Sequence, residues 1–226
     1  MALTNSRVQR TAAPLRQQVV KLIREDILGG DLVPGQRLTE IALCETYDVS
    51  RTVIREALRQ LETENLITVL AGRGPIVTVL TQQDIESLYV VRARMEGLAG
   101  ELFARHASDD QCKTIVALMT RMEKSYRKGT VESRECVNNE FYALLLEGCG
   151  NEVLKENLSG IHARITIFRR FAFVDEGRVA ISMKALRKIV SAAAVRRDPE
   201  QARLACEEHI QVAGELALVE YLRWVK

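Results

Sequence analysis

Three arginines lie at a regular spacing and could together bind an anionic polymer. Arg51, Arg55 and Arg59 are four residues apart. In an α-helix this spacing places them on one side, with a drift of about 40° per step. The guanidinium group can fork onto guanine O6 and N7 or clamp a phosphate. The row of arginines is therefore a candidate surface for nucleic acid.

Hydroxyl and glycine residues flank this row. Ser50 and Thr52 lie at the start of the same segment, where hydroxyls can donate to phosphate beside the free amides of a helix N-terminus. Arg73 lies between two glycines, which add no bulk that would keep it from a DNA backbone or minor groove. With the expected helix cap Thr39 included, the candidate DNA-binding residues are Thr39, Ser50, Arg51, Thr52, Arg55, Arg59, Gly72, Arg73 and Gly74.

A second interpretation of the arginines is purely structural. Charged residues keep any exposed helix hydrated, and Glu56, Glu62 or Glu64 could pair with them. That role needs neither a glycine-flanked Arg73 nor the helix and turn that precede the row. Both features therefore favour DNA binding.

The elements that must position these residues are three helices and a hairpin. Apolar residues recur with a helical period over 14–28, Thr39 is expected to cap a second helix, and Ser50 a third that runs to about Asn65. Two β-rich runs, 66–70 and 76–80, flank a Gly-rich tip. This order is typical of a winged helix-turn-helix. The expected apolar inner stripe of the third helix is Ile54, Ala57, Leu58 and Leu61.

Beyond Leu80 the sequence predicts only helices. The expected helices run from Thr81 to about 106, from Ser108 to 128, and over roughly 131–147, 151–173, 178–197 and 199–223. Thr81 and Asp84 have the spacing of a capping box. Short connections between helices with apolar faces predict an antiparallel bundle. We expect a mainly α protein, with a flexible N-terminus over 1–13, a winged helix-turn-helix over 14–80 and an all-α bundle over 81–226.

The composition narrows the class of protein. At 47% hydrophobic and 27% charged, the 226 residues suit a globular chain with a real core. The net charge of +2 decides nothing about DNA, because a DNA reader needs only a basic face. No apolar run of about 18 residues and no signal-peptide pattern occur, so we expect a cytoplasmic protein without a membrane partner. The five scattered cysteines form no C-x-x-C pair, which argues against a disulfide framework or a zinc ribbon.

The first domain resembles the DNA-binding domain of the GntR superfamily of transcriptional regulators. The resemblance rests on LTE at 38–40, DVSRTVIREAL at 48–58, LE at 61–62 and LI at 66–67. It implies that Arg51 and Arg55 contact DNA from a recognition helix and that Arg73 belongs to the wing.

The chain departs from that pattern at four positions. Ile41 stands where many relatives carry an arginine, so one DNA contact from the second helix would be absent. Asp48 replaces a turn glycine, Val53 a proline, and Asn65 the glycine that usually ends the recognition helix. The last change is mild, because asparagine tolerates the left-handed conformation.

The second domain resembles the FadR-type effector domain, the FCD branch of the same superfamily. The resemblance rests on residues 88–92 with Glu96, and on 138–142, 148–151 and 202–209. It implies a dimer whose bundles bind organic acids, in many members with a metal held by one Asp and three His. Three of those four positions are replaced here, by Asn138, Tyr142 and Leu186, and only His209 remains. A divalent cation needs three or four N or O ligands, so we expect neither a metal nor another cofactor.

The same residues suggest how an effector could bind without a metal. Asn138, Tyr142 and His209 could form the polar floor of a pocket, and Arg92 and Arg164 would pair with a carboxylate if they point inward. The alternative is that Tyr142 and His209 are hydrogen-bonded core residues and the arginines are solvated. The expected function is that of a dimeric regulator that binds a palindromic double-stranded operator and a small organic acid.

Three other functions stay open on the sequence alone. A relative whose ligands are misaligned above would be a metal-dependent sensor, which elemental analysis would reveal. A helical-bundle enzyme would show turnover without DNA, but the chain has no H-E-x-x-H, G-x-S-x-G, P-loop or dinucleotide motif, so we do not expect one. A purely structural interaction protein would need neither the arginine row nor the basic wing.

Overall fold

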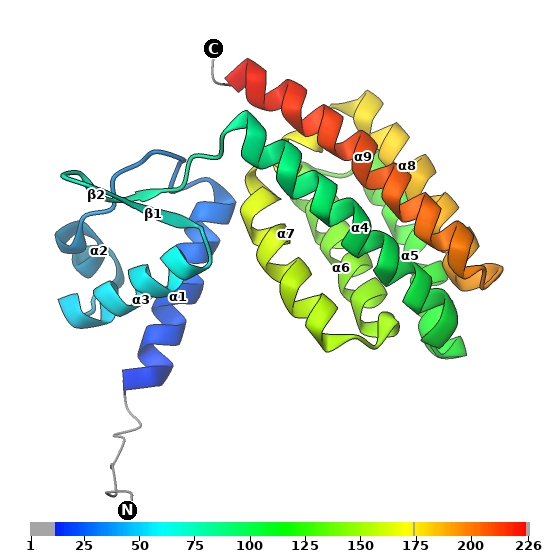
Figure 1. Ribbon diagram of the computed structural model, residues 1–226, viewed down its shortest axis with the longest axis horizontal. Coiled ribbons are helices and arrows are strands. Elements are labelled where there is room, and N and C mark those ends of the chain that lie inside the picture. The colour runs from blue at the N-terminus through cyan, green and yellow to red at the C-terminus, as the bar shows by residue number, and fades with distance from the viewer. Residues whose placement is uncertain (1–11, 174, 225–226) are drawn as a thin grey trace, which may run out of the picture. The chain divides into compact units, whose positions relative to one another are not determined.

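The computed structural model describes residues 12–173 and 175–224, and the chain divides into two compact units at Val79 and Leu80 (Figure 1). The division falls one residue before the boundary expected from the sequence. The reason is packing: Leu80 is buried in the second unit, against Ile85 and Leu88. The mainly α architecture, with an N-terminal winged helix-turn-helix and a C-terminal helical bundle, confirms the expected fold class.

The first unit holds three helices followed by one antiparallel hairpin. Their bounds are α1 Ala12–Gly29, α2 Glu40–Tyr47, α3 Arg51–Thr63, β1 Ile67–Leu70 and β2 Gly74–Val77. The expected inner stripe of α3 is buried, and it packs against α1, whose buried residues are Val19, Val20, Ile23 and Ile27. An isolated helix of this length is only marginally stable in water, so α3 owes most of its stability to the burial of this apolar face.

The ends of α2 and α3 are set by the caps expected from the sequence. The Thr39 hydroxyl accepts from the amide of Ala42 at 3.3 Å, and the Ser50 hydroxyl accepts from that of Val53 at 3.5 Å. Asp48 and Asn65, which stand in place of the family's glycines, adopt left-handed φ angles of 52° and 58°. Residues of these two types tolerate that conformation, so the turns survive the substitutions.

The wing differs from the expectation in its second strand. That strand begins at Gly74 rather than at 76 and ends at Val77 rather than at 80. The tip is shorter than expected, because the Arg73 amide donates to the Leu70 carbonyl at 3.1 Å and closes the turn. On its other edge β2 bonds to the segment before α2, where the amide of Leu38 donates to the carbonyl of Pro75 at 2.8 Å. Pro75 lacks an amide hydrogen but keeps its acceptor, so it fits there.

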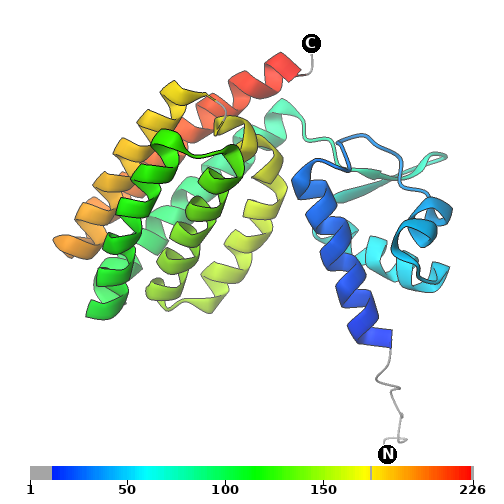
Figure 2. The same ribbon diagram turned by 180° about the vertical axis from the view of Figure 1, so that it is seen from behind.

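The second unit is a bundle of six α-helices within the described residues (Figures 1 and 2). Their bounds are α4 Gln82–His106, α5 Asp109–Lys128, α6 Val131–Cys149, α7 Glu152–Ala172, α8 Glu176–Val190 and α9 Pro199–Trp224. The capping box expected at Thr81 is present, with Asp84 reciprocating, and Ser108 forms a second one with Gln111. These caps satisfy the free amides of the first helical turns.

The helix expected over 178–197 is not continuous. It ends at Val190 and is followed by a short π-helical stretch, Ser191–Val195. Three consecutive alanines of that stretch, Ala192–Ala194, are buried. Their small side chains let this irregular backbone pack closely within the core.

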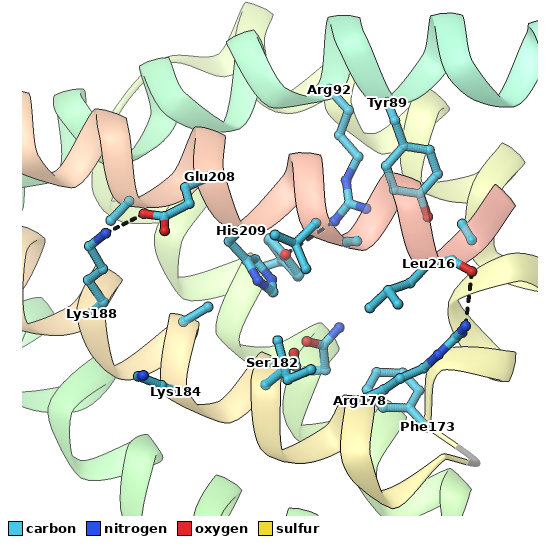
Figure 3. Close-up of a pocket in the computed structure, with 18 residues that line it drawn as sticks. Tyr89, Arg92, Phe173, Arg178, Ser182, Lys184, Lys188, Glu208, His209 and Leu216 are labelled. Carbon is cyan, nitrogen blue, oxygen red and sulfur yellow. Dashed lines mark hydrogen bonds and ion pairs between the residues drawn. The ribbon is translucent and has the colours of Figure 1, made fainter. Parts of the chain in front are cut away.

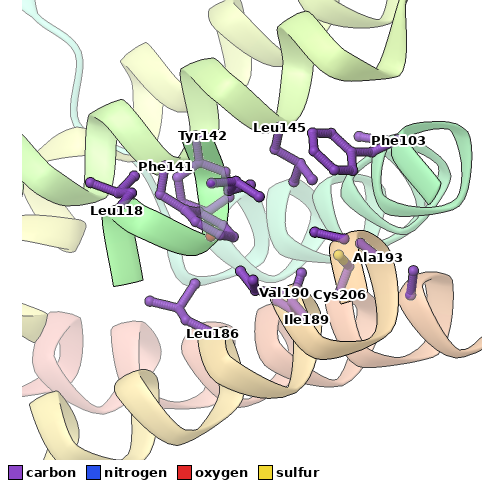
Figure 4. Close-up of a cluster of buried hydrophobic side chains, with 14 of the residues drawn as sticks. Phe103, Leu118, Phe141, Tyr142, Leu145, Leu186, Ile189, Val190, Ala193 and Cys206 are labelled. Atoms are coloured by element: carbon purple, nitrogen blue, oxygen red, sulfur yellow. The ribbon is translucent and has the colours of Figure 1, made fainter. Parts of the chain in front are cut away.

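The core of the bundle is formed by residues of all six helices, α4 to α9 (Figure 4). Phe103 and Phe141 are fully buried in it. Helices α4 and α9 lie especially close, because a Cβ on Gly100 would meet Cys206 Sγ at 2.6 Å and one on Gly214 would meet Tyr89 at 2.9 Å. These two long helices form the frame on which the polar residues of the second unit are placed.

Candidate DNA interface and ligand cavity

The arginine row of α3 lies on its solvent side. Arg51, Arg55 and Arg59 are exposed, while the opposite side of the helix is buried against α1. The Arg55 side chain keeps 59% of its surface exposed although its Nε donates to Glu40 Oε1 at 2.6 Å. Arg51 and Arg59 form no ion pair with any residue that the structure describes. The row is therefore available to a partner.

The glutamates that could have neutralised the row do not do so. Glu64 binds Arg24 of α1 instead, with Arg24 Nη2 at 2.9 Å from Oε1 and 2.8 Å from Oε2. Glu56 and Glu62 are exposed and have no ion pair within the described part of the chain. Among the described residues, the acidic contact of the row is Glu40, in the first turn of α2. The alternative interpretation, in which Glu56, Glu62 or Glu64 pairs with the arginines, therefore finds no support in the residues that the structure describes.

Glu40 and Arg55 act on each other's charge. The hydrogen bond from Arg55 is the largest cause of a lowered pKa of Glu40. Desolvation opposes this shift, and the charges of Arg55 and Arg51 add to it. Glu40 in turn raises the pKa of Arg55. Because the contact is made through Nε, the two terminal amino groups of Arg55 stay available for a bidentate contact to a base or a phosphate.

We expect the Glu40→Gln variant to bind non-specific duplex DNA more tightly than the parent. Removing the Glu40 carboxylate leaves the charge of Arg55 uncompensated, so one more net positive charge faces the phosphates and the slope of log K against log salt should steepen by about 0.9. Titrating a labelled random duplex at several salt concentrations measures this slope. Glu45→Gln, an exposed change on the same helix, is the matched control. Equal slopes for the two variants would contradict the account.

The hydroxyl residues at the helix N-termini can cap their helices and donate a hydrogen bond to DNA at the same time. Thr39 and Ser50 accept amide hydrogens through their oxygens, so each hydroxyl proton stays free to be donated. Thr52 is exposed in the first turn of α3. A phosphate at this end would therefore find hydroxyl donors together with the amides of a helix N-terminus.

The wing tip presents Arg73 to solvent. Gly72 and Gly74 have φ angles of 76° and 79°, and a Cβ at either position would have nothing within 4 Å. Glycine is thus needed here for the left-handed backbone rather than for space. At the position where many relatives carry arginine, Ile41 is 58% exposed.

The second unit contains a cavity of about 540 Å³ between α4, α6, α8 and α9 (Figure 3). Four of the five predicted effector residues line it, namely Arg92, Asn138, Tyr142 and His209. The fifth, Arg164 of α7, does not. The hydrogen bonds of Thr81 are the largest cause of a lowered pKa of Asp84, and the charge of Arg164 lowers it further. Arg164 therefore lies near the start of α4 instead.

Two of the residues that line the cavity, Arg92 and Tyr142, belong to a buried network of charged and polar side chains. Arg92 donates through Nε to Glu96 Oε1 at 2.6 Å and through Nη2 to the Tyr142 hydroxyl at 3.1 Å. His162 Nε2 lies 2.8 Å from the same Glu96 oxygen. Arg92 and Glu96 are each only 2% exposed. Burial opposes the charge on Glu96, but Arg92 and the hydrogen bond from His162 outweigh it and hold the pKa of Glu96 at about 2.

The other polar residues of the cavity are also held in place. The Tyr126 hydroxyl donates to Asn138 Oδ1 at 3.1 Å. His209 is only 8% exposed and lies on α9. Tyr142 therefore combines the two interpretations made from the sequence, because it is a hydrogen-bonded core residue that also lines the cavity.

Sequence reasoning missed most of the charge on the α8 side. Arg178, which is 8% exposed, lines the cavity and donates through Nη2 to the Leu216 carbonyl at 3.2 Å (Figure 3). Lys184 and Lys188 also line it, and Lys188 pairs with Glu208 of α9. The sequence signal that could have indicated this lining is the pair Arg178 and Ser182, which lie one helical turn apart. Whether that face points inward depends on how α8 packs, which periodicity alone does not determine.

The cavity does not suit a divalent cation. Of the positions that the resemblance assigns to metal ligands, Leu186 is fully buried in the apolar core, and the Tyr142 hydroxyl already accepts from a guanidinium. Arg92 would repel a metal at that hydroxyl. Among the described residues, no group of three or more His, Cys, Asp or Glu side chains is placed to hold a metal ion.

An exposed recognition helix with a wing, joined to a bundle with a polar cavity, defines a ligand-responsive class of DNA-binding protein. Two family models match the chain: the gntR family of bacterial regulatory proteins over residues 15–77, and the FCD domain over residues 87–212. The chain belongs to the GntR family. It is a transcriptional regulator with a helix-turn-helix DNA-binding domain and an FCD effector domain, and it is not an enzyme.

Known proteins agree with this assignment. The Nta operon transcriptional regulator of Aminobacter aminovorans is 30% identical over 79% of this chain and 82% of its own length. The uncharacterized regulator YdhC of Bacillus subtilis is 29% identical, over 78% and 79%. Among solved structures, E. coli McbR/YncC has the same fold, with a TM-score of 0.78 and 20% identity over 92% of this chain and 98% of its own. Within the described residues, no helix combines the length and the apolar character needed to cross a membrane.

Proposed function

We propose that this regulator is a homodimer that binds a palindromic operator, and that a small organic acid bound in the bundle changes its affinity for that operator. The observation that carries the proposal is the charge of the cavity. Four cationic side chains and a single carboxylate, Glu208, are among the described residues that line it. The four are Arg92, Arg178, Lys184 and Lys188.

The shape and lining of the cavity favour an amphipathic acid. Its volume of about 540 Å³ is in the range of small-molecule sites. Apolar side chains such as Phe173, Val212 and Leu216 complete the lining. A ligand with a carboxylate at one end and carbon groups elsewhere would therefore satisfy both parts of the wall.

Helix α4 can carry the signal toward the DNA-binding unit. It begins at Gln82, five residues after the wing strand β2 ends at Val77. Arg92 lies ten residues into α4, or about 15 Å along its axis. Two half-sites on DNA are separated by about one helical turn, so a small shift transmitted through the segment 78–82 changes the fit of both recognition helices.

The His209→Ala variant tests the assignment of the cavity. We expect it to weaken the response to effector without changing DNA affinity in the absence of effector, because His209 lies in the bundle and not in the winged domain. The measurement is a thermal-shift screen with organic acids, followed by DNA titration with the acid that binds. Gln211→Ala, an exposed change on the same helix, is the control. An unaltered ligand titration for His209→Ala would remove this residue from the site.

A further inference from the structure

We infer that in this chain the side chain of Arg92, held in place by Glu96 and His162, takes the part that a divalent metal plays in many members of the family, so that a carboxylate effector binds it directly and needs no metal. This inference rests on the proposed function, since it concerns how the same cavity holds its ligand. It follows from three features of the structure: the Arg92 guanidinium has unused N–H donors, its orientation is fixed, and the ligand positions of the family are replaced.

The guanidinium of Arg92 is only partly used by the protein. Its Nε is bound to Glu96 and its Nη2 to Tyr142. Nη1 makes no hydrogen bond to any described residue, and Arg92 lines the cavity (Figure 3). Arginine has five N–H donors in a rigid fork. The unused donors can therefore meet a carboxylate without breaking the bond to Glu96.

Glu96 and His162 fix the direction of this fork. Glu96 lies one turn after Arg92 on α4, and His162 approaches the same oxygen from α7. The Tyr142 ring packs edge-on against the His162 ring with centroids 5.1 Å apart, and it also lies 5.5 Å from the Arg92 carbon Cζ. Three helices thus hold one cation still before any ligand arrives. Such preorganisation lowers the cost of binding.

The side chains at the replaced ligand positions agree with the exchange of a metal for Arg92. At the position of one family ligand, the hydroxyl of Tyr142 accepts a hydrogen bond from Arg92. Leu186, at a third position, provides no donor at all. A guanidinium and a metal both neutralise a carboxylate, but only the guanidinium keeps its place when a chelator is present.

The test compares carboxylate binding in protein dialysed against EDTA with binding after Zn²⁺ is added back. Benzoate, succinate and citrate are the probes, measured by calorimetry and thermal shift on the full chain. We expect at least one probe to bind with the same affinity under both conditions. If a probe binds only with Zn²⁺, the inference is overturned but the proposed organic-acid function stands. If none binds under either condition, both fail.

Variants of the network give the second arm of the test. The double variant Arg92→Met with Glu96→Leu removes both buried charges together, so it avoids leaving one of them unpaired. We expect it to fold and to bind the probe about tenfold to a hundredfold more weakly. The matched control is Arg105→Met with Glu101→Leu, a second ion pair one turn apart on α4 that is absent from the cavity lining. Equal affinity for the two double variants would overturn the inference.

His162 acts as a positioning residue, and its variants separate that role from simple packing. His162→Ala should weaken probe binding, whereas His162→Gln, which keeps an N–H donor for Glu96, should restore most of it. If His162→Gln binds no better than His162→Ala while both unfold at the same temperature, positioning through Glu96 is refuted.

Discussion

The Glu96→Leu variant should be the least stable single variant of the buried network, losing about 3–5 kcal/mol of unfolding free energy. The change leaves Arg92, which is 2% exposed, as an uncompensated charge inside the bundle. Urea denaturation followed by circular dichroism measures the loss. The double variant Arg92→Met with Glu96→Leu should recover most of it, because apolar replacement of a whole buried pair is often neutral. A double variant as unstable as the single one would contradict this reading of the pair.

The same network gives stability a dependence on pH with a defined sign. The pKa of Glu96 falls from its usual 4.5 to about 2 in the folded protein. A carboxylate with a depressed pKa stabilises the fold above pH 4.5, and this contribution is lost as the pH falls from about 4.5 to about 2. The wild-type protein should lose stability through that window more steeply than the double variant does.

The largest effect on DNA should come from the recognition helix. Arg51→Ala and Arg55→Ala should each weaken operator binding about tenfold to a hundredfold while leaving the unfolding temperature unchanged. Both side chains are exposed, so neither contributes to the core. Fluorescence anisotropy with the operator duplex measures the affinity, and Lys21→Ala, an exposed cation on α1, serves as the control.

The two arginines can also be told apart by the form of the loss. An arginine that reads a base loses affinity for the operator more than for other sequences, whereas one that binds phosphate loses both equally and lowers the salt slope by about one. If affinity for the operator is unchanged in both variants, α3 is not the recognition helix.

Much of the fold was predictable because it is governed by local sequence. Periodicity and caps placed the helices, and Ser50, Thr81 and Ser108 all form the caps expected of them. The limits of prediction lay where distant segments meet. The early start of β2 depends on the turn that Arg73 closes, which pairs Gly74 with Leu70 of β1. The π-helical stretch lies where three alanines pack in the core.

The site was predictable only in part, for a similar reason. Arg92 and Tyr142 were found through a resemblance of pattern, and the structure brings them within hydrogen-bonding distance. The partnership of Glu96 with His162, 66 residues away, could not be read from spacing. Arg164 and Arg178 are both arginines on helices, and only packing determines that the second lines the cavity and the first does not.

The most direct test of the central claim is a selection of random-sequence duplexes on the purified protein, followed by titration of the enriched sequence across salt concentrations. The account predicts an inverted repeat with half-sites about one helical turn apart, bound with an affinity that falls linearly on a logarithmic salt scale and depends on Arg51 and Arg55. If no sequence is enriched, or if binding persists unchanged when both arginines are replaced, the exposed face of α3 does not read DNA.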